Sequence, residues 1–143
     1  MTELRSFDRS LPMALLQARE SVMVHFRPLL AEHGLTEQQW RVIRALSAHE
    51  SLDASAVADV TNLLAPSVTR ILARLETMNL TTRHVATSDQ RRSLIELSGE
   101  GRALFSTIAP RSEEIYATLE QSFGSERLNR LLQELNDLQE AST

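Results

Sequence analysis

The sequence predicts a mainly α-helical fold with one small β-hairpin. Apolar residues recur at three- and four-residue steps along most of the chain, which indicates amphipathic helices. In the middle, a short helical pattern (DASAVADV) and a longer one that begins with proline (PSVTRILARLETM) are separated by the turn TNLLA. Two β-rich runs around a polar tip follow at once. This order of elements is that of a winged helix-turn-helix, a layout typical of proteins that read DNA.

The first 50 residues predict two helices. Apolar residues at helical spacing predict one helix from about Asp8 to Glu32, with a kink near Val24 because Pro28 lacks a backbone N–H. Thr36 followed three residues later by Gln39 has the pattern of a capping box, which predicts a second helix through about Ala48.

The helix-turn-helix follows. Asp53 is the expected cap of a short helix from Ala54 to Val60, and the next helix, the recognition helix, begins with Pro66 at its first position. The recognition helix has an apolar stripe made of Val68, Ile71, Leu72, Leu75 and Met78. The side chains left facing outward are candidates to contact base edges and phosphates, although an ordinary solvated face would look the same: Ser67, Thr69, Arg70 and Arg74.

The runs Leu80 to Ala86 and Ser93 to Leu97 predict two strands, here called the wing together with the tip between them. Arg91 and Arg92 at the tip suit a minor groove. The carboxylate of Asp89 would repel phosphate, so we expect it to orient the wing instead. An ion pair with Arg70, Arg74 or Arg91 would do this, and loss of Asp89 would then weaken DNA binding indirectly.

Charge is distributed unevenly along the 143 residues. The formal net charge is −4, but residues 61–95 carry five arginines against two acidic residues, so the rest of the chain carries −7. An acidic body with one basic block suits a protein that meets phosphates through a single surface.

Composition argues against other classes of protein. There is no cysteine, the four histidines have no metal-ligand spacing, and no glycine-rich phosphate loop is present, so we expect no metal, no cofactor and no enzymatic activity. The N-terminus does not have the pattern of a secretion signal, and no window approaches the roughly 18 apolar residues of a membrane span. A cytoplasmic protein with no membrane partner is the simplest expectation.

The C-terminal run carries a leucine stripe at helical spacing: Leu128, Leu131, Leu132, Leu135 and Leu138. An apolar face of this size predicts a dimer interface, with packing back onto the same chain as the alternative.

Specific motifs add a family resemblance. The run from Leu63 to Arg102 resembles the core of the MarR family of transcriptional regulators, and residues 34–46 (GLTEQQWRVIRAL) are similar to the family's second-helix signature. The hallmark D-x-R, a strand and L-[ST]-x-x-G correspond to Asp89, Arg91, Leu97, Ser98 and Gly101. The resemblance implies one domain over residues 1–143, with a DNA-binding lobe at 36–97 and dimerisation helices at 1–35 and 98–143. It also implies a homodimer on a pseudo-palindromic double-stranded DNA operator.

Within the family, the opening of the chain looks most like the subgroup that represses operons for homoprotocatechuate (3,4-dihydroxyphenylacetate) breakdown. This implies a repressor that responds to a phenolic or aromatic carboxylic acid such as 4-hydroxyphenylacetate. Two positions depart from the family pattern. Ala65 stands where a capping Ser, Thr or Asp is usual, and Asn79 replaces a common glycine.

The prediction of an effector site starts from one charged residue, Arg19. Arg19 is the only charged residue on an apolar face of the first helix, so its guanidinium needs an anion, either an internal carboxylate or that of an aromatic acid. The resemblance implies a ligand pocket that includes Arg19, Met23, Trp40 and Arg44. Two alternatives remain open, namely a helical protein-interaction module without sequence-specific DNA binding and a MarR-type regulator of a different regulon.

Overall fold

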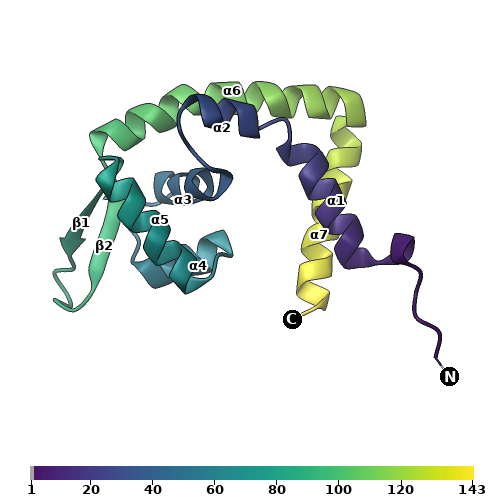
Figure 1. The fold of residues 1–143 in the computed structure, drawn as a ribbon, viewed down its shortest axis with the longest axis horizontal. Coiled ribbons are helices and arrows are strands. Elements are labelled where there is room, and N and C mark those ends of the chain that lie inside the picture. The colour runs from purple at the N-terminus through teal and green to yellow at the C-terminus, as the bar shows by residue number, and fades with distance from the viewer. Residues whose placement is uncertain (1) are drawn as a thin grey trace. The chain divides into compact units, whose positions relative to one another are not determined.

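The computed structural model describes residues 2–143, and the chain divides into two compact units, Met1–Ala109 and Pro110–Thr143. The predicted fold class is confirmed, since the chain is mostly helical with one two-stranded antiparallel hairpin (Figure 1). The first unit contains η1 (Phe7–Arg9), α1 (Leu11–Met23), α2 (Arg27–Glu32), α3 (Glu37–Ser47), α4 (Ala54–Thr61), α5 (Ala65–Thr77), β1 (Thr81–Val85), β2 (Ser93–Leu97) and the first part of α6 (Gly99–Phe123). The second unit contains the rest of α6 and α7 (Ser125–Ala141).

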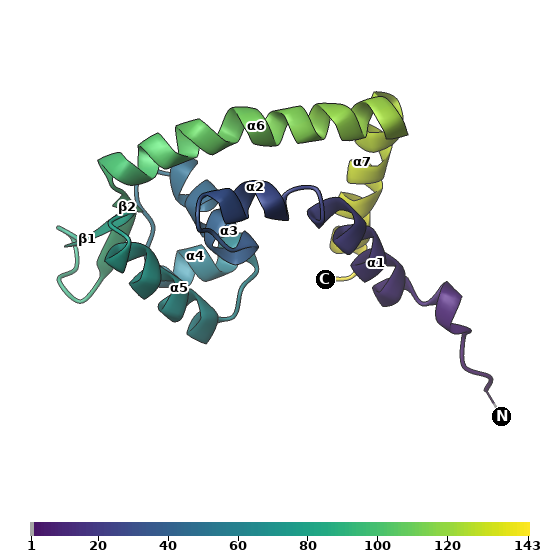
Figure 2. The same cartoon turned by 45° about the horizontal axis from the view of Figure 1, so that its top comes forward.

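The core of the first unit lies between α3, α4, α5 and the hairpin, which pack against one another (Figure 2). Each helix contributes its apolar stripe, and several side chains are fully buried: Val42, Ile43, Val57, Val68, Leu72 and Leu75. The predicted stripe of the recognition helix, α5, is therefore confirmed except for Met78, which follows the helix and is only half-buried. This packing fixes which face of α5 remains free.

The predicted first helix is wrong in its extent. A 3₁₀ turn comes first, Ser10 caps α1, and the helix ends at Met23 before α2 begins at Arg27. At the break, the N–H groups of His25 and Phe26 donate to carbonyls three residues back, at 3.2 and 3.0 Å. Pro28 has no N–H for the carbonyl of Val24 and its ring crowds that group, so the position of the distortion was predicted but its severity was underestimated.

The caps explain where α3 and α4 begin. The Thr36 hydroxyl accepts the Gln39 N–H at 3.1 Å while the Gln39 side chain accepts the Thr36 N–H at 3.0 Å, which confirms the capping box. Asp53 accepts the Ala56 N–H at 2.8 Å, as predicted. Helix α5 begins at Ala65, one residue earlier than predicted. The capping position is therefore Leu64 and not Ala65, and Leu64 forms no side-chain cap bond.

The hairpin pairs β1 with β2 in an antiparallel register in which Arg83 lies opposite Ile95. The predicted strands are confirmed to within one residue at each end. A third backbone segment, not predicted from the sequence, pairs with β2 at Leu52. The Leu52 N–H donates to the Ile95 carbonyl at 2.9 Å and the Ile95 N–H donates back at 2.8 Å. The hairpin is thus tied to the loop that precedes α4.

The junction between the hairpin and α6 explains the L-S-x-x-G motif. The Ser98 hydroxyl donates to the Asn79 carbonyl at 2.6 Å and accepts the Gly101 N–H at 3.0 Å. A Cβ on Gly101 would collide with the Leu80 carbonyl oxygen, so only glycine fits there. Asn79 adopts a positive φ of 63°, which is the left-handed conformation for which asparagine is the usual substitute for glycine.

The second unit is helical. Pro110 lies inside α6, and α7 follows after Gly124, which has a positive φ of 104°. No residue of α7 is buried, and Leu131 and Leu132 of the leucine stripe are exposed. Among residues 2–143, no helix is long and apolar enough to cross a membrane.

Candidate nucleic-acid interface

The free face of α5 carries the predicted base- and phosphate-reading residues. Thr69, Arg70 and Arg74 are exposed, whereas Ser67 is half-buried. The Thr69 hydroxyl donates to the Ala65 carbonyl at 3.1 Å, and Arg70 donates to the Ser67 hydroxyl at a long 3.4 Å. The two guanidinium groups are thus available to an external partner at little cost in broken bonds.

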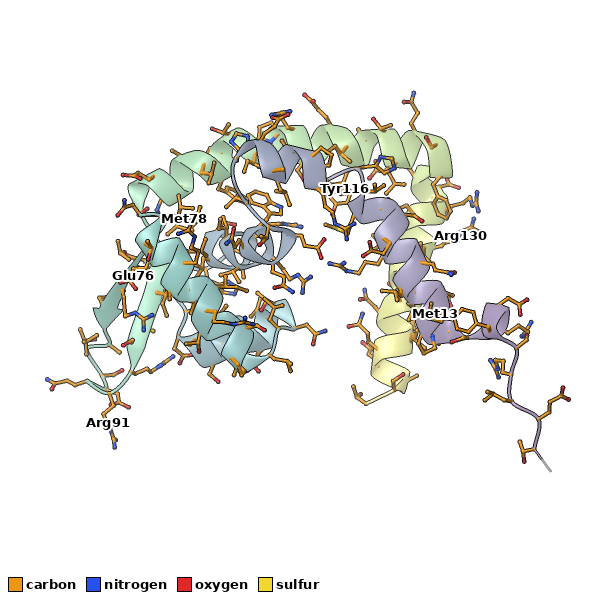
Figure 3. The ribbon with its side chains drawn as sticks, in the orientation of Figure 1. Met13, Glu76, Met78, Arg91, Tyr116 and Arg130 are labelled. Atoms are coloured by element: carbon orange, nitrogen blue, oxygen red, sulfur yellow. The ribbon has the colours of Figure 1, made fainter. Side chains whose placement is uncertain are left out.

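The tip of the wing is built around Asp89. Its carboxylate accepts the Arg91 N–H at 3.0 Å, and its carbonyl accepts the Arg92 N–H at 3.1 Å, so Asp89 closes the turn through both side chain and backbone. The Arg91 guanidinium lies 3.5 Å from the same carboxylate, yet its side chain is 94% exposed. Figure 3 shows Arg91 at the far end of the hairpin, pointing away from the helices.

Arg92 has a different position from the one predicted. Its Nε donates to Asp53 Oδ2 at 2.7 Å, so the side chain returns to the start of α4 instead of projecting freely. Asp53 therefore caps α4 with one oxygen and holds the wing with the other. The backbone N–H of Ala56 and the Arg92 guanidinium together keep the pKa of Asp53 below its ordinary value.

Of the three arginines expected as partners of Asp89, Arg91 forms the ion pair, at 3.5 Å and inside the tip. The described residues show no ion pair between Asp89 and Arg70 or Arg74, so the carboxylate does not join the wing to α5. Arg83 on β1 and Glu76 on α5 form the ion pair that joins the two elements, at 3.9 Å. The two residues lie on different elements, a helix and a strand, so neither helical nor strand spacing predicted this pair.

A four-member charge network joins α1, α2 and α3. Arg19 lies 3.0 Å from Glu37, and Arg27 donates to Glu37 at 3.0 Å and to both oxygens of Glu20 at 2.9 and 2.8 Å. Partial burial alone would raise the pKa of Glu37, but hydrogen bonds from Arg19 and Arg27 outweigh it, and the pKa is lowered. The hydrogen bonds from Arg27 likewise lower the pKa of Glu20.

Of the two anions considered for Arg19, the internal carboxylate is therefore present in the form of Glu37. The expected apolar face around Arg19 is not formed as a single surface, because the helix breaks and only its α2 part is buried. Trp40 is buried and stacks on Phe105 with ring centroids 5.6 Å apart. Met23 is half-buried at the end of α1 and Arg44 is exposed on α3. Within residues 2–143, no group of three or more His, Asp or Glu side chains is arranged to hold a metal ion.

Known proteins share this arrangement. The profile of the MarR family matches residues 33–92. The homoprotocatechuate degradative operon repressor of Escherichia coli is 43% identical over 122 residues, which are 85% of this chain and 82% of that protein. The crystal structure of NadR in complex with 4-hydroxyphenylacetate is 37% identical, with a TM-score of 0.82 over 96% of this chain and 97% of that one.

A relative bound to DNA has the same fold. The transcriptional repressor CouR, bound to a 23-mer DNA duplex, is 28% identical with a TM-score of 0.78, covering 96% of this chain and 99% of that one. The likeness extends through the winged helix-turn-helix and the flanking helices. The chain belongs to the MarR family of transcriptional regulators, and its relatives are DNA-binding repressors, not enzymes.

Proposed function

We propose that this regulator represses an operon for aromatic-acid breakdown and is released from its operator by a phenolic acid. The substrate of that operon would be homoprotocatechuate or 4-hydroxyphenylacetate. The observation that carries the proposal is the 43% identity to the E. coli homoprotocatechuate degradative operon repressor over most of both chains. The NadR complex with 4-hydroxyphenylacetate supports the same class of effector.

We propose further that the regulator binds a pseudo-palindromic operator as a homodimer, with α5 in the major groove and Arg91 in the minor groove. The leucine stripe of α7 supports this, because none of its side chains is buried within the chain. In the first unit, Phe7 and Leu11 near the N-terminus are also exposed apolar side chains that a second copy could cover. A regulator that binds chromosomal DNA would act in the cytoplasm, which agrees with the expected location.

The effector site of this proposal includes Arg19, Met23, Trp40 and Arg44. Arg19 is the residue that can receive the acid's carboxylate, since it already binds a carboxylate, that of Glu37, at 3.0 Å. A ligand carboxylate would compete with Glu37 for this guanidinium. Glu37 lies in the first turn of α3 and Arg19 in α1, so the exchange would loosen the connection of α1 to the DNA-binding lobe. The fraction of molecules in the conformation that fits the operator would then fall.

The test is an anisotropy titration of the protein with the DNA upstream of its own gene, and with a scrambled duplex of equal composition. We expect the operator to bind at least ~10³-fold more tightly than the scrambled duplex. Addition of 4-hydroxyphenylacetate or 3,4-dihydroxyphenylacetate should reverse this binding. Specific binding that neither acid affects would contradict the proposed effector and favour one alternative, a MarR-type regulator of another regulon. Equal binding to both duplexes would favour the other alternative, a protein-interaction module.

Arg19→Gln tests the effector site. This variant should lose most of its response to the acid, because a neutral amide cannot replace a charge-assisted bond. Because it also lacks the ion pair with Glu37, it should bind the operator more weakly than the parent protein even without the acid. Arg102→Gln, at an exposed position in α6, is the matched control and should respond like the parent protein. Equal responses from both variants would remove Arg19 from the proposed site.

A further inference from the structure

An exposed apolar surface lies at the turn between α4 and the recognition helix. We call it the turn patch, and it consists of Val60, Leu64, Ala65 and Pro66, all exposed. The Val60 side chain is 53% exposed and that of Leu64 is 78% exposed, among the highest values for large apolar residues of this chain. Nothing in residues 2–143 covers this patch.

The backbone holds the turn patch in a defined position. Asn62 ends α4 in the left-handed conformation, with a φ of 58°. The Leu64 carbonyl then accepts the Val68 N–H at 3.0 Å as the first bond of α5. Leu64 is thus the last residue before the recognition helix, on the end of the helix-turn-helix that approaches base pairs in this class of DNA reader.

The chemistry of the turn patch restricts what it can recognise. None of its four side chains has a hydrogen-bonding group, and the nearby Thr69 hydroxyl is already bonded to the Ala65 carbonyl. The patch can therefore contact bases only through van der Waals and hydrophobic interactions. In the major groove, the apolar group that distinguishes one base pair from another is the C5 methyl of thymine.

We propose that Leu64, supported by Val60, is a specificity-determining residue that recognises thymine methyl groups in the operator. This inference rests on the proposed binding of operator DNA and adds the base class that the turn patch reads. DNA is favoured as the occupant because Arg70 and Arg74, on the exposed face of the same helix, provide phosphate-binding charge beside the patch. CouR, which is similar over 96% of this chain, was solved bound to a DNA duplex, and this supports DNA as the class of partner.

The experiment removes the methyl group without changing any hydrogen bond. Operator affinity is measured with thymine, and then with every thymine of the protected half-sites replaced by uracil. For the parent protein, we expect a loss of about fourfold for each methyl buried against Leu64, from the usual gain of burying one methyl-sized group. Leu64→Ala should bind the thymine duplex more weakly than the parent and should bind thymine and uracil duplexes equally, within about twofold.

Arg91→Ala is the matched control. It should weaken binding to both duplexes and keep the parent's thymine-to-uracil ratio, since it acts at the wing. Leu64 is exposed, so the thermal midpoint of Leu64→Ala should match that of the parent and exclude misfolding. A ratio near one for the parent, or an unchanged ratio in Leu64→Ala, overturns the inference while leaving operator binding intact. No preference of the parent for the operator over a scrambled duplex overturns both.

Discussion

Arg91 and Arg92 are neighbours in the sequence, but only Arg92 pairs with a residue outside the tip. Arg91 projects from the wing with almost its whole side chain in solvent, whereas Arg92 is held by Asp53 at 2.7 Å. From the sequence, an arginine-bearing tip on the hairpin could be predicted. The sequence could not predict which arginine would be used internally, because Asp53 lies 39 residues away and its own sequence signal was that of a helix cap.

These surroundings predict that the two arginines contribute to operator affinity in different ways. Arg91→Ala should lower operator affinity and reduce the slope of log K against log salt by about one per protomer, since it removes a positive charge from the minor groove, between the phosphates of the two strands. Arg92→Ala should lower affinity through a displaced wing and leave that slope unchanged within error. Both are measured by anisotropy titrations at several salt concentrations.

Asp53→Asn is the matched variant for the partner. Asparagine keeps an oxygen that can accept the Ala56 N–H but removes the charge that holds Arg92, so it should reproduce the effect of Arg92→Ala with little loss of thermal stability. If Arg92→Ala reduced the salt slope as much as Arg91→Ala, Arg92 would be a DNA contact and the wing-holding role would be wrong.

Single residues also determine how the elements join. The position of the break between α1 and α2 was predictable from Pro28. Whether the chain bends or forms two separate helices there depends on the contacts that hold α1 and α2 in place. Arg27, the first residue of α2, bridges Glu20 of α1 and Glu37 of α3. Spacing along one helix could not reveal this network, because it forms only after the chain has turned back on itself.

The network predicts a pH dependence of stability. The pKa values of Glu20 and Glu37 are lowered in the folded protein, so both carboxylates stabilise the fold fully above their unfolded pKa of about 4.5. Their contribution disappears as pH falls from that value through the lowered, folded pKa values. The thermal midpoint should therefore fall between pH 5 and pH 3, and less steeply in Glu37→Gln than in the parent protein.

Glu50→Gln serves as the control for this experiment. Glu50 is exposed and forms no ion pair within residues 2–143, so its variant should show the same pH profile as the parent. Identical profiles for Glu37→Gln and the parent would mean that the network contributes nothing to stability.

The junction of the hairpin with α6 provides a second prediction at the scale of elements. Gly101→Ala would bring a methyl group against the Leu80 carbonyl and the Leu97 side chain, both buried, and should lower the free energy of unfolding by about 1–3 kcal/mol. Gly99→Ala, two residues earlier, faces open space and should be neutral or stabilising by up to about 1 kcal/mol. Chemical denaturation measures both, and equal effects would contradict the account of the L-S-x-x-G motif.

At the scale of the whole molecule, an acidic chain carries one block of net positive charge, at residues 61–95, which include the recognition helix and most of the wing. The helices, the hairpin and the outward face of α5 were predictable from periodicity, caps and turn residues, because each depends on neighbours close in the sequence. The Leu52 bridge, the Arg92–Asp53 pair and the Arg19 network depend on long-range packing and were not. The leucine stripe of α7, of which no residue is buried and Leu131 and Leu132 are exposed, is the remaining feature that a single chain leaves unexplained.

A hydroxyl-radical footprint of the protein on the DNA upstream of its own gene tests the central claim most directly, because it reports symmetry, spacing and groove together. A homodimer with two recognition helices and two wings predicts two equivalent protected half-sites, about 10–10.5 base pairs apart from centre to centre or a multiple of that spacing. Arg91→Ala should lose the outer minor-groove protections alone. A single unsymmetrical patch, or uniform protection along the duplex, would contradict the account.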